Sequence, residues 1–153
     1  MLYPALVRGG QMLAAAGFEA KATALADELL ALLESSAPTG MLSIPELAFL
    51  LADYGRGSEL LAVLDARKDR STPWLEGARA VAEGDFIRAA DVFGRMGAQP
   101  HEALARLHAA RALSEAGRRR EAEPELRQAL DFYRRVDAKR YVALGEELLA
   151  ASA

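Results

Sequence analysis

The chain contains no cysteine and only two histidines, and it has no long apolar run. Absence of cysteine excludes disulfides, thiol nucleophiles and cysteine-ligated metals. No apolar stretch approaches the roughly 20 residues that a membrane-spanning helix needs. The first ten residues hold Pro4, Arg8 and two glycines, which is not the pattern of a signal peptide. We therefore expect a cytoplasmic protein that does not enter a membrane.

The chain also has no large excess of positive or of negative residues. Charged residues make up 27% of the chain, yet the formal net charge is only -3, so no global field attracts nucleic acid or anionic lipid. Hydrophobic residues make up 52% of the 153 residues. This length and composition suffice for one folded domain with a core.

No constellation typical of an enzyme or a metal site occurs. His101 and His108 are about 10 Å apart along a helix at roughly 1.5 Å per residue, too far for one ion to bridge. We interpret them as surface or groove histidines. There is no glycine-rich loop followed by Lys-Ser or Lys-Thr and no convincing Ser–His–Asp set. The sequence predicts a protein without catalytic residues, metal or cofactor.

The residues that are present favour helix. Alanine and leucine dominate, β-branched residues are sparse, and no alternating strand pattern occurs. Apolar residues instead recur at intervals of three and four, as on an amphipathic helix. Examples are Leu25, Leu29, Leu32 and Leu33, and then Leu47, Leu50, Leu51 and Tyr54. Leu104 and Leu107 lie on a later stripe of the same spacing, together with Arg111 and Ser114.

Four glycines divide these helical segments at intervals of about 30 to 40 residues, a period typical of stacked helical hairpins. They are Gly17, Gly55, Gly84 and Gly117. Glycine just past a helix end is a common stop signal because it adopts positive φ without strain. Alignment on these glycines brings small residues together seven positions before each one: Gly10, Ala48, Gly77 and Ala110. Small residues there would let paired helices approach closely.

The pattern predicts an all-α solenoid that forms one domain over residues 1–153. We expect four hairpins, at residues 3–34, 43–68, 72–97 and 100–136, and a capping helix at 138–150. Start signals agree, with Ser43–Glu46 resembling a capping box and Thr72–Pro73 placing proline in a first turn. Pro124 does not fit an uninterrupted helix after Gly117, because an interior proline removes a hydrogen bond. We therefore expect that helix to start late, near Glu121, or to kink at Pro124.

The third copy resembles the tetratricopeptide repeat. Gly84-Asp85-Phe86, followed by Ala89 and Phe93, is similar to the turn and second helix of that motif. Trp74 and Gly77 resemble the start of its first helix, although Glu76 and Ala80 replace the preferred Leu and Tyr. The resemblance extends over roughly residues 3–135 and implies a scaffold that binds other proteins.

The end of the chain, residues 121–152, is similar to the tail of large bacterial signalling ATPases and transcription regulators, which often contain a Phe-Tyr-Arg stretch like Phe132–Arg134. This resemblance implies a regulatory module that could be the C-terminal portion of a longer protein.

In the tetratricopeptide family the first helices of successive hairpins line a concave face. The resemblance places nine residues there: Arg8, Gln11, Phe49, Asp53, Trp74, Ala78, His108, Arg111 and Glu115. Mixed aromatic and charged side chains suit capture of a peptide or helix, with Trp74 and Phe49 as anchors. The alternative is self-association of a larger regulator. Nucleic-acid contact through Arg118–Arg120 is the weaker alternative, because three glutamates follow and no aromatic residues are interleaved.

Overall fold

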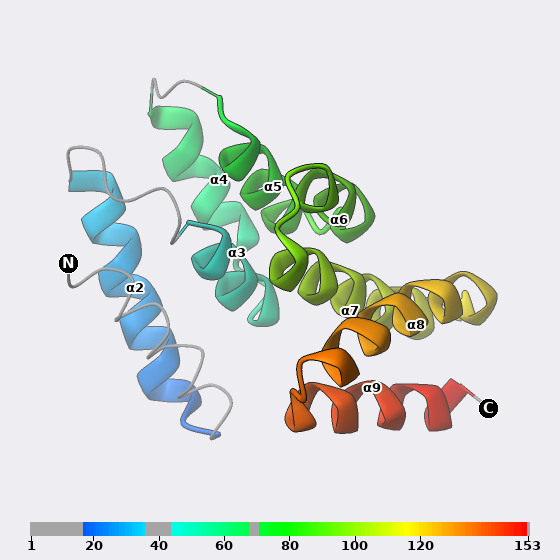
Figure 1. Ribbon diagram of the computed structural model, residues 1–153. Coiled ribbons are helices and arrows are strands. Elements are labelled where there is room, and N and C mark those ends of the chain that lie inside the picture. The colour runs from blue at the N-terminus through cyan, green and yellow to red at the C-terminus, as the bar shows by residue number, and fades with distance from the viewer. Residues whose placement is uncertain (1–16, 36–43, 68–70, 153) are drawn as a thin grey trace. The chain divides into compact units, whose positions relative to one another are not determined.

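The computed structural model describes residues 17–35, 44–67 and 71–152. Over these ranges the chain is helical and has no strand, which confirms the predicted all-α fold class (Figure 1). No helix in this part of the chain is both long and apolar enough to cross a membrane. The chain divides into two compact units, Met1–Gly84 and Asp85–Ala153. The single domain over residues 1–153 stays a prediction.

The first unit contains four described helices: α2 (Glu19–Ser35), α3 (Ile44–Asp53), α4 (Gly57–Ala66) and α5 (Pro73–Ala82). The segment before Gly17, where the first predicted hairpin begins, lies outside the described residues. Leucines on one face of each of the first three helices form the core, because their periodic spacing turns them to the same side. Leu33, Leu50 and Leu60 are all buried, together with Val81 of α5.

The start of α5 follows the expected signals. The Thr72 hydroxyl accepts a hydrogen bond from the Leu75 amide at 3.3 Å, and Pro73 occupies the first helical turn. Proline fits there because the first amides of a helix have no intrahelical acceptor. The structure thus confirms the helix start expected at Thr72–Pro73. At the start of the second unit, the Asp85 carboxylate accepts from the Arg88 amide at 3.2 Å.

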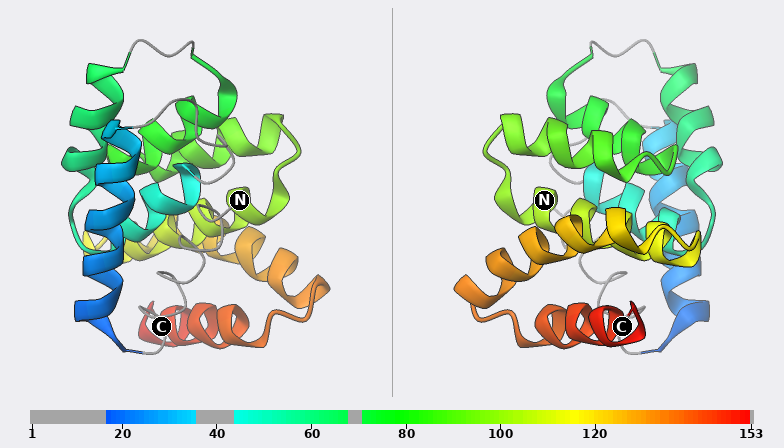
Figure 2. Two further views of the ribbon diagram at one scale, coloured as in Figure 1. Left: turned by 90° about the vertical axis from the view of Figure 1, so that its left-hand side faces the viewer. Right: turned by 90° about the vertical axis from the view of Figure 1, so that its right-hand side faces the viewer.

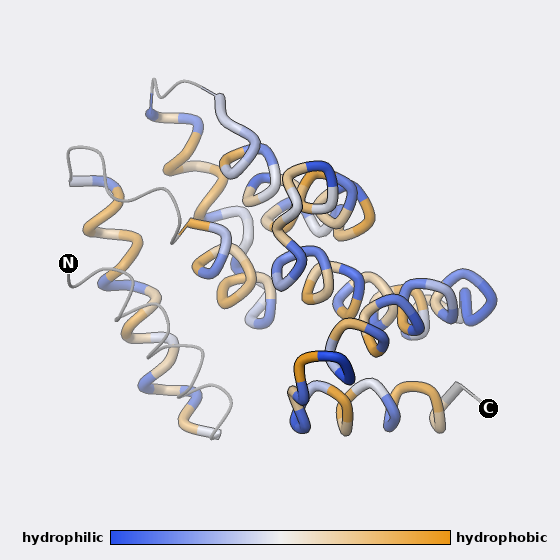
Figure 3. Tube along the Cα trace, viewed as in Figure 1, coloured by the Kyte–Doolittle hydropathy of each residue, from blue (hydrophilic) through white to orange (hydrophobic). Residues whose placement is uncertain are grey.

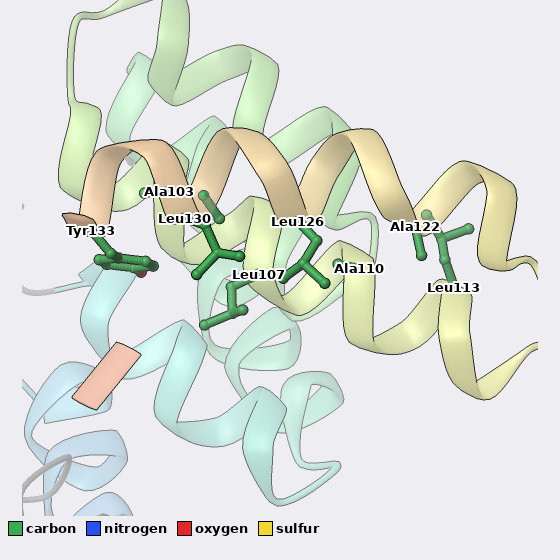
Figure 4. Packing of buried hydrophobic residues seen from close by; sticks show 9 residues of the cluster. Ala103, Leu107, Ala110, Leu113, Ala122, Leu126, Leu130 and Tyr133 are labelled. Carbon is green, nitrogen blue, oxygen red and sulfur yellow. The ribbon is translucent and has the colours of Figure 1, made fainter. Parts of the chain in front are cut away.

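The second unit also contains four helices: α6 (Phe86–Arg95), α7 (Gln99–Glu115), α8 (Arg119–Arg135) and α9 (Lys139–Ser152). Helices α7 and α8 form an antiparallel hairpin, and α9 runs back along α8 in both views of Figure 2. Figure 4 shows the core between α7 and α8, where Leu107 and Leu126 lie among the alanines Ala103, Ala110 and Ala122. The small alanine side chains allow these two helices to approach closely.

The turns between helices repeat one motif. The four glycines expected at helix ends all have positive φ, from 67° to 79°, and Gly97 between α6 and α7 has φ 70°. The residue that follows each positive-φ residue donates its backbone N–H to a carbonyl oxygen in the last turn of the preceding helix, as in a Schellman motif. The corresponding bonds run from Arg56 to Leu51, Ala98 to Phe93, Arg118 to Leu113 and Ala138 to Tyr133, at 2.8 to 2.9 Å.

At the α8–α9 turn the motif uses Asp137, the one described non-glycine residue with positive φ, at 53°. We expect Asp137→Gly to raise the free energy of unfolding of the second unit by about 1 kcal/mol, because glycine adopts this conformation without a Cβ penalty. Urea unfolding followed by circular dichroism measures the change. Asp137→Ala is the control and should destabilise, and a destabilised Asp137→Gly variant would contradict the strain argument.

Helix α8 differs from the expectation in its start. It begins at Arg119, and Pro124 lies inside it, whereas the sequence suggested a start near Glu121. Proline removes one amide donor, the one that would bond the Arg120 carbonyl. The exposed position of Pro124 and the buried apolar face of the same helix explain why the helix nevertheless continues through it.

Candidate partner-binding site

The nine residues predicted for a concave face occupy very different environments. Arg8 and Gln11 lie outside the described residues. In the first unit, Phe49 and Ala78 are core residues with exposed fractions of 1% and 0%, whereas Trp74 is half-buried and Asp53 is exposed. Within this unit, the exposed Asp53 and half-buried Trp74 therefore remain as surface candidates, and Phe49 contributes packing.

In the second unit the predicted residues come from α7. His108 has an exposed fraction of only 6%, Arg111 is half-buried and Glu115 is exposed. The expectation of a surface or groove histidine is therefore wrong for His108. The reason lies in α6, because the Phe86 ring lies 5.1 Å from the His108 ring and covers it.

His108 and Arg111 contact each other directly. The Arg111 Nη2 atom lies 3.1 Å from His108 Nδ1. Because a guanidinium can only donate, Nδ1 is the acceptor and carries no proton in this arrangement. The buried ring thus helps to hold the Arg111 side chain on α7.

The neighbours of α7 cover its faces to different degrees within the second unit. Helix α6 contacts it through ring pairs, with Phe93 lying 5.2 Å from His101, and α8 packs on the side of Ala103 and Ala110. Leu104, Arg111 and Glu115, seven and four residues apart, share a stripe with the buried His108. We call these three residues the open face of α7. Leu104 and Arg111 are half-buried on it and Glu115 is exposed.

Leu104 was not among the predicted site residues, although its spacing from Arg111 and Glu115 was readable in the sequence. The open face combines an apolar side chain with one positive and one negative charge. Such a surface contributes apolar contact from Leu104 and orientation from the charges.

A partly buried ion-pair network joins α7 to α8 on another side of α7. Arg106 donates to the Glu102 carboxylate at 2.8 Å and to the Glu125 carboxylate at 2.7 Å. Burial disfavours the charged guanidinium, but the hydrogen bonds that it donates to both carboxylates outweigh this effect and raise the pKa of Arg106. Side-chain exposures of 14% for Arg106 and 15% for Glu125 indicate that this network is a structural link between the helices.

Two members of this network, Glu102 and Arg106, also line a hollow of about 220 Å³. Arg135 at its rim donates to the Gln99 side chain at 3.2 Å, and its guanidinium lies 5.6 Å from the Phe132 ring centre. Its lining residues are Gln99, Glu102, Ala103, Arg106, Gln128, Asp131, Phe132 and Arg135. Charges of both signs balance in the hollow, and Arg106 and Arg135 are each held by other lining residues.

Side chains that could hold a metal ion do not cluster in the part of the chain that the structure describes. No cluster of three or more His, Cys, Asp or Glu side chains could hold a metal ion there. Burial, and to a smaller degree Tyr141, raises the pKa of the Tyr133 phenol, which keeps it neutral in the core. Tyr133 therefore acts in packing.

Helix pairs, repeated turns and an open helix face together define a helical-repeat protein. Residues 80–148 match the family model described as tetratricopeptide repeat. The matched segment covers α6, α7 and α8 and most of α9, with the end of α5. The comparison with curated proteins finds no match, and neither does the comparison with solved structures. Tetratricopeptide repeats are generally non-catalytic scaffolds for protein partners, so the match indicates a protein-interaction scaffold.

Proposed function

We propose that this protein is an interaction module that holds an extended or helical segment of a partner protein on the open face of α7. The observation that carries the proposal is the stripe of Leu104, Arg111 and Glu115, which brings a half-buried leucine and two side chains of opposite charge together beside the buried His108. A preformed helical surface binds a segment with little ordering cost of its own.

Each residue of the open face has a separate role in this proposal. Leu104 provides the apolar contact that gains most from exclusion of water. Arg111, positioned by His108 at 3.1 Å, pairs with an acidic group of the bound segment, and Glu115 pairs with a basic one. Opposite charges one helical turn apart would fix the direction in which the segment lies.

Selection from a phage-displayed random peptide library tests the proposal. We expect enriched peptides to carry an apolar residue between charges, and Leu104→Asp to weaken their binding at least about tenfold, because it buries a charge at the contact. Ile87→Asp, the same change at an exposed apolar residue of α6, is the matched control. Peptides that bind equally well to Leu104→Asp and to the unchanged protein would exclude the open face.

The wider setting of the module is proposed from the resemblance of residues 121–152 to the tails of bacterial signalling proteins. We propose a cytoplasmic regulatory role, without a cofactor, as part of a larger signalling or regulatory protein. Trp74, half-buried at the start of α5, is a second proposed anchor, within the first unit. Reading the genomic frame upstream of Met1 tests the setting, because a continuous frame into nucleotide-binding or output domains is the expected result.

A further inference from the structure

Within the second unit, the apolar contacts of helix α9 with α7 and α8 lie on one side of the helix. Its Tyr141 ring stacks on Tyr133 of α8, with ring centres 4.6 Å apart and planes 11° apart. Gly145 lies so close to α8 that an added Cβ would be 2.6 Å from Leu130. Val142, Leu148 and Leu149 pack against the α7–α8 core. These contacts fix which side of α9 is turned to its own chain.

A different side of α9 carries Arg140, Leu144 and Glu147. Their spacing of four and three residues places them in one stripe on consecutive turns. All three are exposed, and Leu144, with an exposed fraction of 40%, is the most exposed leucine in the described part of the chain. Orange and blue segments alternate along this helix in Figure 3. We call these residues the α9 stripe.

Arg140 and Glu147 form no hydrogen bond or ion pair with any described residue. The neighbouring Glu146, by contrast, accepts a hydrogen bond from Arg134 at 3.1 Å. The two charges of the stripe lie about 10 Å apart at roughly 1.5 Å per residue, too far to pair within one helix. They are therefore available to charges on another molecule.

The stripe is complementary to itself. Leu144 lies near the midpoint between the positive and the negative residue. If a second copy lies antiparallel across it, Arg140 faces Glu147 of the second copy, and Glu147 faces Arg140 of the second copy. Leu144 then meets its own equivalent at the two-fold axis. Ala143 and Ala151, both exposed beside the stripe, are small enough to let the two helices approach.

We propose that this protein forms a two-fold symmetric dimer in which the α9 helices of two copies pack antiparallel through Arg140, Leu144 and Glu147. A parallel arrangement would place like charges against each other, so the charge pattern selects the antiparallel one. One helix face makes a small interface, and the dimer is accordingly weak and dependent on concentration. This inference does not rest on the open face of α7.

Sedimentation equilibrium of the full chain, from micromolar to near-millimolar concentration, tests the dimer. We expect concentration-dependent association for the unchanged protein. Arg140→Glu and Glu147→Arg should each weaken self-association at least about tenfold, because each places two pairs of like charges across the axis. The double variant, with both charges exchanged, should associate like the unchanged protein.

Mixing the two single variants gives the sharpest result. Arg140→Glu carries two negative charges on the stripe and Glu147→Arg carries two positive ones, so the mixture should form a heterodimer although each variant alone is monomeric. Lys139→Glu is the matched control: it makes the same charge change as Arg140→Glu on another side of α9, and should leave association unchanged. Circular dichroism verifies that every variant remains helical.

A protein that is monomeric at all concentrations would overturn the proposal. So would a dimer that persists in both single variants, since its interface would then lie elsewhere. Peptide binding to the open face is measured separately through Leu104→Asp, so failure of the dimer and failure of the proposed function give different results.

Discussion

Replacing Gly57 with alanine is expected to lower the free energy of unfolding by about 3 kcal/mol, because the new methyl group collides with backbone. Gly57 begins α4, and a Cβ added there would lie 2.0 Å from the Ala82 carbonyl oxygen of α5. A backbone carbonyl at the end of a helix cannot rotate away as a flexible side chain can. The ends of α4 and α5 would therefore have to separate. Urea unfolding followed by circular dichroism measures the loss.

Ser58→Ala is the matched control for this change. Ser58 is the next residue of α4 and is exposed, so its replacement should alter the free energy of unfolding by no more than about 0.5 kcal/mol. If Gly57→Ala proved as stable as Ser58→Ala, the close approach of α4 and α5 would not exist in solution.

Arg106→Ala is expected to destabilise the second unit by about 2 kcal/mol, since it leaves the Glu102 and Glu125 carboxylates without their shared donor. Burial of Glu125 makes the loss larger than for a surface pair, and its remaining exposure of 15% keeps it below the cost of a fully buried charge. Thermal unfolding of the full chain, with urea unfolding as a second measurement, gives the value.

Arg127→Ala is the control for the ion-pair network. Arg127 also pairs with a glutamate one helical turn before it, Glu123, but the two side chains are exposed by 70% and 51%. Its removal should cost no more than about 0.5 kcal/mol. Arg106→Lys should be intermediate, because an ammonium cannot reach two carboxylates on different helices with the geometry of a guanidinium. Equal losses of unfolding free energy for Arg106→Ala and Arg127→Ala would show that partial burial does not strengthen the contribution of the Arg106 ion pairs.

Turn positions could be predicted because glycine adopts positive φ more readily than any other residue. All four glycines chosen for their period have positive φ. Asp137 occupies the equivalent place between α8 and α9, and it escaped prediction because aspartate in the left-handed region is uncommon and carries no regular signal. The start of α8 was also predicted incorrectly. Pro124 suggested a start near Glu121, but packing of the apolar face holds the helix together from Arg119 onward.

Burial of individual side chains was much harder to predict than their helices. Phe49 was expected to contact a partner, and it has an exposed fraction of 1%. His108 was expected at the surface, yet the Phe86 ring covers it. Helical spacing tells which residues share a face, but it does not tell which neighbouring helix will lie against that face.

The sequence by itself determined that the described part of the chain is all-helical, that a helix starts at Thr72–Pro73, and that four glycines adopt positive φ. These properties follow from local interactions over three to five residues, namely periodicity, capping and backbone sterics. Only the tertiary structure decided that Arg106 links α7 to α8, that Gly57 meets the end of α5, and that Leu104, Arg140, Leu144 and Glu147 stay accessible in the second unit. Those outcomes depend on which helix faces are covered by segments distant in the chain, and packing between helices settles that only when the whole unit folds.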